Sequence, residues 1–350
     1  MSNILDNEEY IAELKEASSK GIDWKVFNNK KILLSGATGL LGRFFVDLIM
    51  YKNIQHEINC KIIAISRKKD EINKYFDRYL SNENFEYKIQ DVTEKIDIEN
   101  DIDYIVHAAS NTSPTQYALD PIGTILTNVY GTKNLLDLAV KKTCKKFIFV
   151  SSFEVYGKVE KEEIFENDFG IVNCTVLRSC YPESKRLSES LCEAYSEQKN
   201  VDISIVRLAR VFGPTMNLNS TLATAQFIKN GINDEDVVLK SDGMQKYSFN
   251  YVSDAVLSIL ITIINGKNKE AYNVADEKYN VKLRDFAESV AKISGKNVIF
   301  DVPNEIEKKG QSNSIMSIMN GNKLKEIGWQ VDSNMTEKIE KTIRILKNII

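Results

Sequence analysis

The fold is decided by residues 31–42, which read Lys31-Ile32-Leu33-Leu34-Ser35-Gly36-Ala37-Thr38-Gly39-Leu40-Leu41-Gly42. Residues 31–35 form a short apolar run of the kind found in buried strands, and residues 40–50 carry apolar side chains at helical spacing. The three glycines between them permit a tight turn. The stretch therefore predicts a strand, a turn and a helix in direct succession.

The same unit recurs along the chain. Further strands are expected at 62–65, 85–89, 104–107, 146–150 and 203–208, and helices at 71–80, 124–140, 183–198 and 255–264. Strands that alternate with helices specify a parallel sheet with helices on both faces, because crossover connections are right-handed. We therefore expect an α/β protein with a doubly wound parallel sheet of the Rossmann type and a smaller C-terminal lobe.

The rhythm of strand and helix also suggests how the chain is divided. Residues 1–29 are expected to form a helical extension anchored by Trp24. Residues 30–210 are expected to form the Rossmann domain, with 246–275 returning to it. The irregular stretch 211–245 breaks the alternation and, with 276–350, is expected to form the C-terminal lobe that binds substrate.

Composition narrows the classes of partner. With 46 Lys and Arg against 49 Asp and Glu, the net charge is −3, which gives no long-range attraction to nucleic acid or to an anionic membrane. Only two histidines occur, so a metal site is not expected and acid-base chemistry must fall to tyrosine, lysine or carboxylates. No signal peptide or membrane span is expected, so we predict a cytoplasmic protein with reduced cysteines and a small-molecule substrate.

The glycine turn also indicates a ligand site, because it joins a strand to a helix. Its glycines allow a pyrophosphate to approach the backbone N–H groups at the start of the helix, which predicts a dinucleotide site. The choice between NAD and NADP stays open, because Arg67 could pair with the extra phosphate of NADP or lie in a solvated loop. Asp91 and Val92 could meet the adenine or form a turn. The residues that this pattern assigns to the cofactor are Gly36, Thr38, Gly39, Leu40, Leu41, Gly42, Ser66, Arg67, Asp91 and Val92.

A second pattern concerns chemistry. Tyr181 and Lys185 stand four residues apart, on one face of a helix that begins near Pro182. A free tyrosine has a pKa of about 10, and a nearby lysine together with an oxidised nicotinamide would favour the phenolate. The pattern alone also fits surface helix residues, but downstream of the glycine turn it predicts Tyr181 as an acid-base group.

These motifs resemble those of the extended short-chain dehydrogenase/reductases, whose members mostly remodel nucleotide sugars. The resemblance covers nearly the whole chain. Besides the glycine turn, Tyr181 and Lys185, it rests on 107–110 (His-Ala-Ala-Ser), 128–132 (Asn-Val-Tyr-Gly-Thr), 151–157 (Ser-Ser-Phe-Glu-Val-Tyr-Gly), 207–214 and 323–329. The runs 178–186 and 251–254 are similar to those of the UDP-glucuronate decarboxylase-like members.

The resemblance implies roles for individual residues. Ser152 corresponds to the hydroxyl that hydrogen-bonds the reacting sugar oxygen, Tyr181 to the base, and Lys185 to the group that binds the nicotinamide ribose. Further cofactor contacts are implied for Ala108, Ala109, Ser110, Asn128, Ser151, Tyr181 and Lys185, and substrate contacts for Ser110, Asn111, Arg210, Lys246 and Tyr247. The implied reaction removes a proton from a sugar hydroxyl, usually at carbon 4, while hydride passes to the nicotinamide.

Two positions bear on the step after that oxidation. Epimerases of the family usually carry a small or hydroxyl residue at the position of Glu154, whereas dehydratases and decarboxylases carry Glu. Dehydratases usually also have Asp one residue earlier, where this chain has Phe153. Glu154 is therefore a fourth catalytic candidate, with a solvated carboxylate at the end of a strand as the alternative.

Two departures from the family stand near the substrate. Most relatives place an arginine ahead of the aromatic residue in the later motif, where this chain reads Gln-Lys-Tyr-Ser-Phe at 245–249. Lys246 could supply the charge there without the bidentate fork of arginine. Arg210 stands where relatives commonly have Asn, and it could contact a substrate carboxylate or phosphate, or pair with a neighbouring acid.

Three functions are consistent with these features. The first is an NAD-dependent enzyme that oxidises a nucleotide sugar and completes epimerisation, dehydration or decarboxylation. The second is an NADPH-dependent reductase of a nucleotide-linked keto-sugar, and the third is a cofactor-sensing module without chemistry, against which the intact Ser152, Tyr181 and Lys185 argue. The resemblance also implies a homodimer formed through the helices at 124–140 and 183–198.

Overall fold

A computed structural model describes residues 3–301 and 316–349 of the chain. Its centre is a parallel sheet of seven strands in the order β10-β6-β5-β4-β1-β2-β3. These strands are β1 (Lys30–Ser35), β2 (Cys60–Ser66), β3 (Phe85–Ile89), β4 (Tyr104–His107), β5 (Lys146–Ser152), β6 (Ile203–Leu208) and β10 (Glu270–Val274). The α/β Rossmann prediction is confirmed, because the order reverses beside β1 as in a doubly wound sheet.

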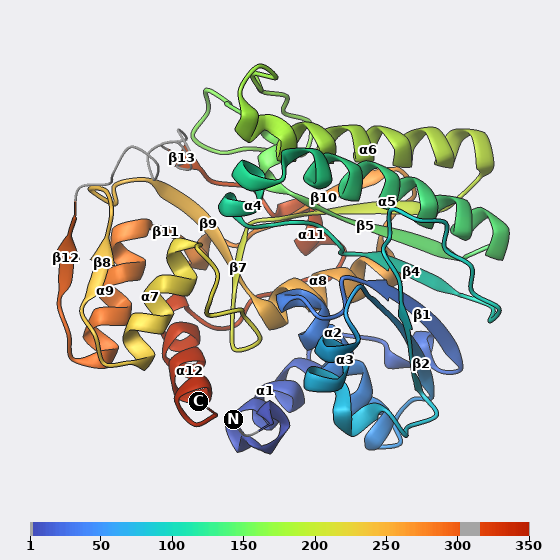
Figure 1. Cartoon of the computed structure of the whole chain (residues 1–350), viewed down its shortest axis with the longest axis horizontal. Helices are drawn as coiled ribbons and strands as arrows, with labels where there is room; N and C mark the ends of the chain where they lie inside the picture. The colour runs from blue at the N-terminus through green and yellow to red at the C-terminus, as the bar shows by residue number, and fades with distance from the viewer. Residues whose placement is uncertain (1–2, 302–315, 350) are drawn as a thin grey trace.

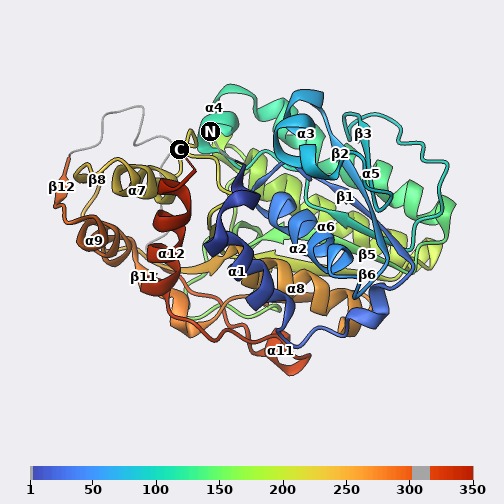
Figure 2. The ribbon, with the colours of Figure 1, turned by 90° about the horizontal axis from the view of Figure 1, so that it is seen from below.

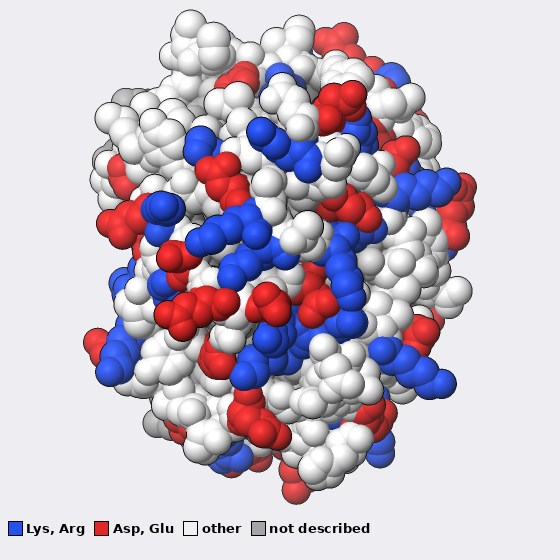
Figure 3. All heavy atoms as spheres, turned by 90° about the vertical axis from the view of Figure 1, so that its right-hand side faces the viewer, with Lys and Arg blue, Asp and Glu red and all other residues white. Residues whose placement is uncertain are grey.

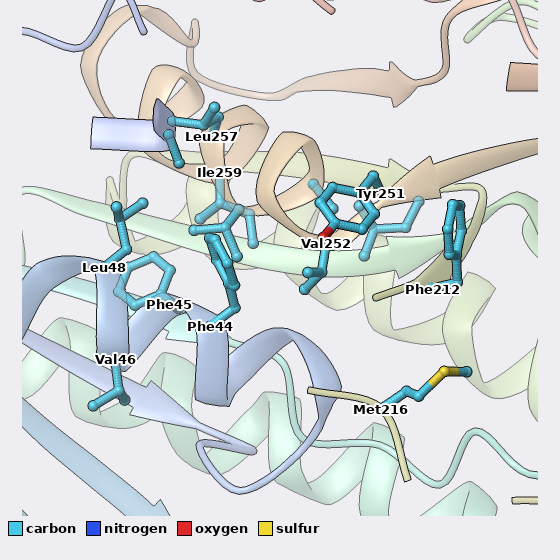
Figure 4. Close-up of a cluster of buried hydrophobic side chains, with 14 of the residues drawn as sticks. Phe44, Phe45, Val46, Leu48, Phe212, Met216, Tyr251, Val252, Leu257 and Ile259 are labelled. Carbon is cyan, nitrogen blue, oxygen red and sulfur yellow. The ribbon is translucent and has the colours of Figure 1, made fainter. Parts of the chain in front are cut away.

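Helices cover both faces of this sheet. One face carries α5 (Pro121–Lys142) and α6 (Cys180–Lys199), which lie side by side, and the other carries α2 (Leu40–Ile54) and α8 (Val252–Asn265) (Figure 1). Successive strand residues point to opposite faces, so Leu33 packs into the core beneath α5 while Ile32 and Leu34 pack into the core beside α2 and α8. Figure 4 shows the second core, where Phe44, Phe45 and Leu48 of α2 face Leu257 and Ile259 of α8.

A smaller group of elements lies to one side of the central sheet (Figure 1). It contains a second sheet of β7 (Arg210–Phe212), β9 (Lys246–Tyr251), β11 (Asn280–Lys282) and β13 (Met316–Ser317), and a strand pair, β8 (Val237–Leu239) and β12 (Val298–Phe300). Its helices are α7 (Ala223–Ile232), α9 (Leu283–Ser294) and α12 (Met335–Lys347), whereas α11 (Asn322–Glu326) contacts β10 of the central sheet. Within 246–275, β9 pairs with β7 and β11, whereas β10 joins the central sheet.

The predicted N-terminal extension forms α1 (Glu8–Ser18) and a 3-10 turn, Trp24–Phe27. Figure 2 shows α1 between α12 on one side and α2 and α8 on the other. The Tyr10 hydroxyl donates to Asp47 of α2 over 2.6 Å, and the Nζ of Lys338 in α12 donates to both Glu13 carboxylate oxygens at 3.0 and 3.2 Å. The extension therefore joins the last helix of the chain to the first helix of the Rossmann unit.

Charged side chains contact one another beneath α1 and at its edge, and some of them are fully buried. We call this set the α1 charge cluster; it consists of Glu13, Glu16, Lys20, Asp254, Lys338 and Lys341. Glu13 and Lys338 are 0% and 1% exposed. Each buried charge in the pair therefore has an opposite charge at hydrogen-bond distance.

The surface and the helices bear on possible partners. On the face of the molecule farthest from α9 and β12, basic and acidic side chains are intermixed (Figure 3). Within 3–301 and 316–349, no helix is long and apolar enough to cross a membrane. All five cysteines lie in the described part of the chain, and none forms a disulfide.

Candidate active site

Two glycines of the turn, Gly36 and Gly42, leave no space for a Cβ atom. Gly36 has φ +74°, and a Cβ built on it would lie 2.8 Å from the backbone of Ala108 and Ala109. A Cβ on Gly42 would lie 2.3 Å from the Gly36 carbonyl oxygen. Gly39 caps α2 without a side-chain hydrogen bond, which leaves the N-terminal N–H groups of this long helix for a ligand. The turn fits the pyrophosphate of a dinucleotide, which the helix dipole also favours.

The ends of β2 and β3 lie beside this turn. Arg67 is largely exposed, and its guanidinium is 4.0 Å from the carboxylate of Asp91, which itself accepts two hydrogen bonds from Thr93. The Thr38 hydroxyl donates to Glu71 over 2.8 Å. The sequence pattern did not predict Glu71, which brings a negative charge to the turn and disfavours the extra phosphate of NADP. Val92 is buried against Gly131.

A chain of hydrogen bonds connects the end of β4 to α6. The Ser110 hydroxyl donates to the Asn128 side chain over 2.7 Å, and the Asn128 amide donates to the Ser184 hydroxyl over 2.8 Å. Asn111 donates to Thr124 over 3.4 Å. The Asn128 amide is buried, and it is hydrogen-bonded to both serines. Asn128 therefore positions Ser110 relative to α6.

Tyr181 and Lys185 are brought together with Ser152, because β5 ends at Ser152 and α6 begins at Cys180. Both side chains are buried, at 5% and 2% exposure. The Lys185 ammonium donates to the carbonyl of Val150 over 2.8 Å, and burial lowers the pKa of Lys185 to about 8. This arrangement places an ammonium group and a phenol at the ends of the central strands, where open α/β sheets bind their ligands.

The surroundings of Tyr181 favour its protonated form. Burial and then the Glu154 carboxylate raise the pKa of Tyr181 above its ordinary value, while the hydroxyl of Ser152 and the charge of Arg178 act in the opposite direction. The sequence argument expected Lys185 to help lower the pKa of Tyr181, but in the structure the Lys185 ammonium donates to the carbonyl of Val150. A further positive charge, such as an oxidised nicotinamide, is needed to make the phenol a base.

Glu154 is held by a partner that the sequence pattern did not assign. It lies in the 3-10 turn Phe153–Tyr156 after β5 and accepts from Arg178 over 2.7 Å. The Arg178 guanidinium lies 4.5 Å from the centre of the Tyr117 ring, and Tyr117 stacks on Tyr181 at 4.8 Å between ring centres. Glu154 is therefore a paired, half-buried carboxylate whose charge acts on Tyr181, and not a solvated end of a strand.

The second departure, Arg210, lies beside the same turn. Its guanidinium carbon is 3.5 Å from the centre of the Tyr247 ring and 4.5 Å from that of Phe153. This position follows from the pairing of β7 with β9, in which Arg210 is opposite Phe249. Lys246 is exposed at the start of β9. The guanidinium next to Tyr247 thus comes from Arg210, and the ammonium of Lys246 is at the surface.

Ser151 is bound to a carboxylate of α6. Its hydroxyl donates to Glu189 over 2.6 Å, and Glu189 in turn accepts from Arg207 at 2.7 and 3.1 Å. These contacts tie β5, α6 and β6 together. Ser151 is therefore engaged in a structural network beside the neighbouring Ser152.

The sequence between residues 32 and 275 matches the model of the NAD dependent epimerase/dehydratase family. The chain belongs to this family. As a member it is an enzyme, and NAD is its cofactor. The α/β fold, the enzyme class and the NAD prediction are confirmed, and the alternative of an NADPH-dependent reductase is not favoured.

Among curated proteins, this family member is similar to UDP-glucuronic acid decarboxylases. It is 30% identical over 320 residues to UDP-glucuronic acid decarboxylase 1 of Xenopus tropicalis, covering 91% of this chain and 73% of the frog protein. It is 34% identical over 249 residues to UDP-glucuronic acid decarboxylase 5 of Arabidopsis thaliana, covering 71% of this chain and 70% of the plant protein.

Two solved structures share the fold of this family member. UDP-glucose 4-epimerase of Thermotoga maritima, solved with UDP-glucose, gives a TM-score of 0.77 at 22% identity and covers 91% of this chain and 99% of its own. UDP-glucuronic acid 4-epimerase of Bacillus cereus, in complex with UDP-glucuronic acid and NAD, gives 0.76 at 20% identity and covers 91% and 100%.

Proposed function

We propose that this protein uses NAD to oxidise the carbon-4 hydroxyl of a UDP-linked uronic sugar and then releases carbon dioxide from that sugar. The observation that carries the proposal is the burial of Tyr181, Ser152 and Lys185 together at the strand ends beside the glycine turn. The identity to UDP-glucuronic acid decarboxylases supports the choice of substrate and outcome. Epimerisation without loss of carbon dioxide is the second candidate, supported by the shared fold of a UDP-glucuronic acid 4-epimerase.

The cofactor is held by the chain's own backbone and side chains. The turn of Gly36, Gly39 and Gly42 would receive the pyrophosphate, and the end of β2 with Glu71 would lie at the adenosine ribose. The remaining cofactor contacts proposed from the motifs are Thr38, Leu40, Leu41, Ser66, Arg67, Asp91, Val92, Ala108, Ala109, Ser110, Asn128, Ser151, Tyr181 and Lys185. NAD supplies an acceptor and donor of hydride at the sugar carbon.

Three side chains manage the proton. The Tyr181 phenol oxygen accepts the proton of the sugar hydroxyl once the positive charge of the nicotinamide favours the phenolate. Ser152 donates a hydrogen bond to the same sugar oxygen and so orients it. Lys185 is buried and thus shielded from water, and it holds the nicotinamide ribose. Burial thus serves the reaction, because it strengthens each of these electrostatic contacts.

Glu154 is the group that distinguishes the outcomes. In a hexuronate the carboxylate is bonded to carbon 5, the neighbour of carbon 4. A carbonyl at carbon 4 therefore lets the carboxylate leave as carbon dioxide, because the electrons of the broken bond pass toward that carbonyl. The carbon left behind would take a proton from water, which the ion-paired Glu154 and Arg178 would position, and hydride would return to carbon 4 while Tyr181 gives its proton back to the sugar oxygen. Contacts to the substrate are proposed for Ser110, Asn111, Arg210, Lys246 and Tyr247.

The test is incubation of the purified protein with UDP-glucuronate and NAD, followed by mass spectrometry of the nucleotide product. Loss of carbon dioxide is the expected result. An unchanged mass with altered chromatographic retention would indicate epimerisation, and loss of water would indicate dehydration. Either result would overturn decarboxylation while keeping the oxidation at carbon 4, and an unmodified nucleotide sugar would overturn the proposed function as a whole.

We also propose that the protein forms a homodimer in the cytoplasm. Ile122, Ile125, Leu126 and Tyr130 form one exposed apolar stripe on α5, and Leu187 is half exposed on the adjacent α6. Light scattering on the wild-type protein should give the mass of two chains. Leu187→Lys should shift the population toward one chain, whereas Ile54→Lys, at a similarly exposed position on α2, should not. A wild-type protein of single-chain mass would contradict the dimer.

A further inference from the structure

The charged side chains around Glu154 do not balance. We call Glu154, Arg178 and Arg210 the active-site charge cluster. Glu154 is bound by Arg178, and its charge also acts on Arg210. Two guanidinium groups thus share one carboxylate. The cluster carries an excess positive charge in a place that water reaches poorly.

Arg210 is the member without a polar partner. Within residues 3–301 and 316–349, its side chain makes no hydrogen bond and no carboxylate lies within ion-pair distance of it, and its buried Nη1 has no hydrogen-bond partner. Its contacts are the rings of Tyr247 and Phe153, which hold the guanidinium plane but accept no N–H bond. Such a pair of rings fixes the orientation of an arginine while its donors stay available.

The ends of the cluster indicate which ligand atoms Arg210 can reach. Phe153 follows Ser152 directly and the same turn carries Glu154, so the contact with Phe153 puts Arg210 beside the residues proposed to meet the reacting part of the sugar. In a hexuronate the carboxylate is bonded to carbon 5, the neighbour of carbon 4, whereas the diphosphate is attached to carbon 1, opposite carbon 4 in the ring. When Tyr181 contacts the carbon-4 hydroxyl, the carboxylate of the sugar is therefore in a better position to reach Arg210 than the diphosphate is.

We infer that Arg210 is the residue that selects a sugar carrying a carboxylate over a neutral sugar, by donating its unpartnered N–H groups to the two carboxylate oxygens. This inference rests on the proposed function, because it takes a nucleotide sugar to occupy the site. A neutral hexose would leave the buried guanidinium without an acceptor, which is unfavourable. A uronate supplies both the missing negative charge and two acceptors in the planar geometry that arginine matches.

The experiment measures dissociation constants of UDP-glucuronate and UDP-glucose by calorimetry on the protein loaded with NADH, which cannot accept a hydride, so that neither sugar is converted. Wild type should bind UDP-glucuronate more tightly than UDP-glucose. Arg210→Gln should weaken UDP-glucuronate by about 30-fold or more, the effect typical of removing one partner of a buried charge pair. Its affinity for UDP-glucose should change by less than about threefold. Arg210→Lys keeps the charge without the fork and should fall between wild type and Arg210→Gln.

A matched control is Arg284→Gln. Arg284 also lies over an aromatic ring, Phe300 at 4.9 Å, but it is exposed and paired with Glu288. Its substitution should alter neither affinity. Circular dichroism of each variant establishes that the fold is retained, and the ratio of the two affinities is insensitive to a general loss of active protein.

The possible results separate the inference from the function on which it rests. Equal weakening of both UDP-sugars by Arg210→Gln would assign Arg210 to the diphosphate and overturn the carboxylate. Unchanged affinity for both would overturn any anion contact. Either result leaves the oxidation of a nucleotide sugar intact, whereas a wild-type protein that binds neither UDP-sugar would overturn the proposed function and this inference together.

Discussion

The α1 charge cluster and the active-site charge cluster are both shielded from water, but they are built differently. In the first, Glu13 accepts from Lys338 through both oxygens and also contacts Lys341. In the second, Arg178 is paired with Glu154, whereas Arg210 has no ion-pair partner among the residues that the structure describes. A buried charge is tolerated when its partner is part of the protein. The difference indicates that the first cluster joins elements of the fold, whereas the second is completed by a ligand.

The largest effect is expected beside the unbalanced cluster. Tyr181→Phe removes the group that accepts the proton and should lower kcat by about 100- to 10,000-fold, as for the loss of a general base. The free energy of unfolding should change little, because the ring and its stacking on Tyr117 remain. Product formation and urea unfolding measure the two quantities. Tyr195→Phe, in the same helix, is the control and should leave kcat unchanged, whereas a Tyr181→Phe enzyme with wild-type kcat would rule out the phenol as base.

The balanced cluster should respond in the opposite way. Glu13→Leu leaves the buried Lys338 without its closest carboxylate and should lower the free energy of unfolding by about 3–5 kcal/mol, with kcat of the folded protein retained. Glu9→Leu, in the same helix, removes only the exposed pair with Arg344 and should cost less than about 1 kcal/mol. Equal losses for the two variants would show that burial of the pair does not matter.

A pH effect should mark Asp254, which belongs to the α1 charge cluster. Burial raises the pKa of this carboxyl from 3.8 to about 6. Between those two values the folded state binds more protons than the unfolded state, so stability falls as pH rises through the window, by up to about 3 kcal/mol. Asp254→Asn should remove this slope. The difference in unfolding free energy between wild type and variant, measured across the window, should therefore shift against the wild type as pH rises; a constant difference would contradict the raised pKa.

The smallest effect is expected from Arg210→Gln in the absence of substrate. The lost contacts with the Tyr247 and Phe153 rings are offset by relief from burying an unpartnered cation, so the free energy of unfolding should change by less than about 1 kcal/mol. Urea unfolding of the ligand-free protein measures it. A loss as large as that of Glu13→Leu would show that Arg210 holds the fold together, and the contrast between the clusters would fail.

Local patterns in the sequence were sufficient for the central fold. The apolar run before Gly36 and the helical spacing after Gly39 predict β1 and α2, because both depend on neighbouring residues. Tyr181 and Lys185 were found for the same reason, since four residues make one helical turn. These features need no knowledge of which distant segments meet.

The remaining part of the candidate site depends on such meetings. The sequence pattern could not show that Arg178 pairs with Glu154, that Tyr117 stacks on Tyr181, or that Glu71 reaches Thr38, because these residues come from different elements. The positions of Arg210 and Lys246 likewise depend on the pairing of β7 with β9. The sequence motifs assigned these residues to the site, but their contact partners could be identified only from the fold.

The position of α1 has a consequence for synthesis on the ribosome. Glu13 is made 325 residues before Lys338, and its other partner, Lys341, follows later still. Helix α1 can dock on α2 and α8 earlier, but the Glu13 carboxylate has neither lysine partner until α12 has been made. Premature termination before α12 would leave that carboxylate unpaired and that side of α1 uncovered, and quality-control proteases would meet an exposed surface there.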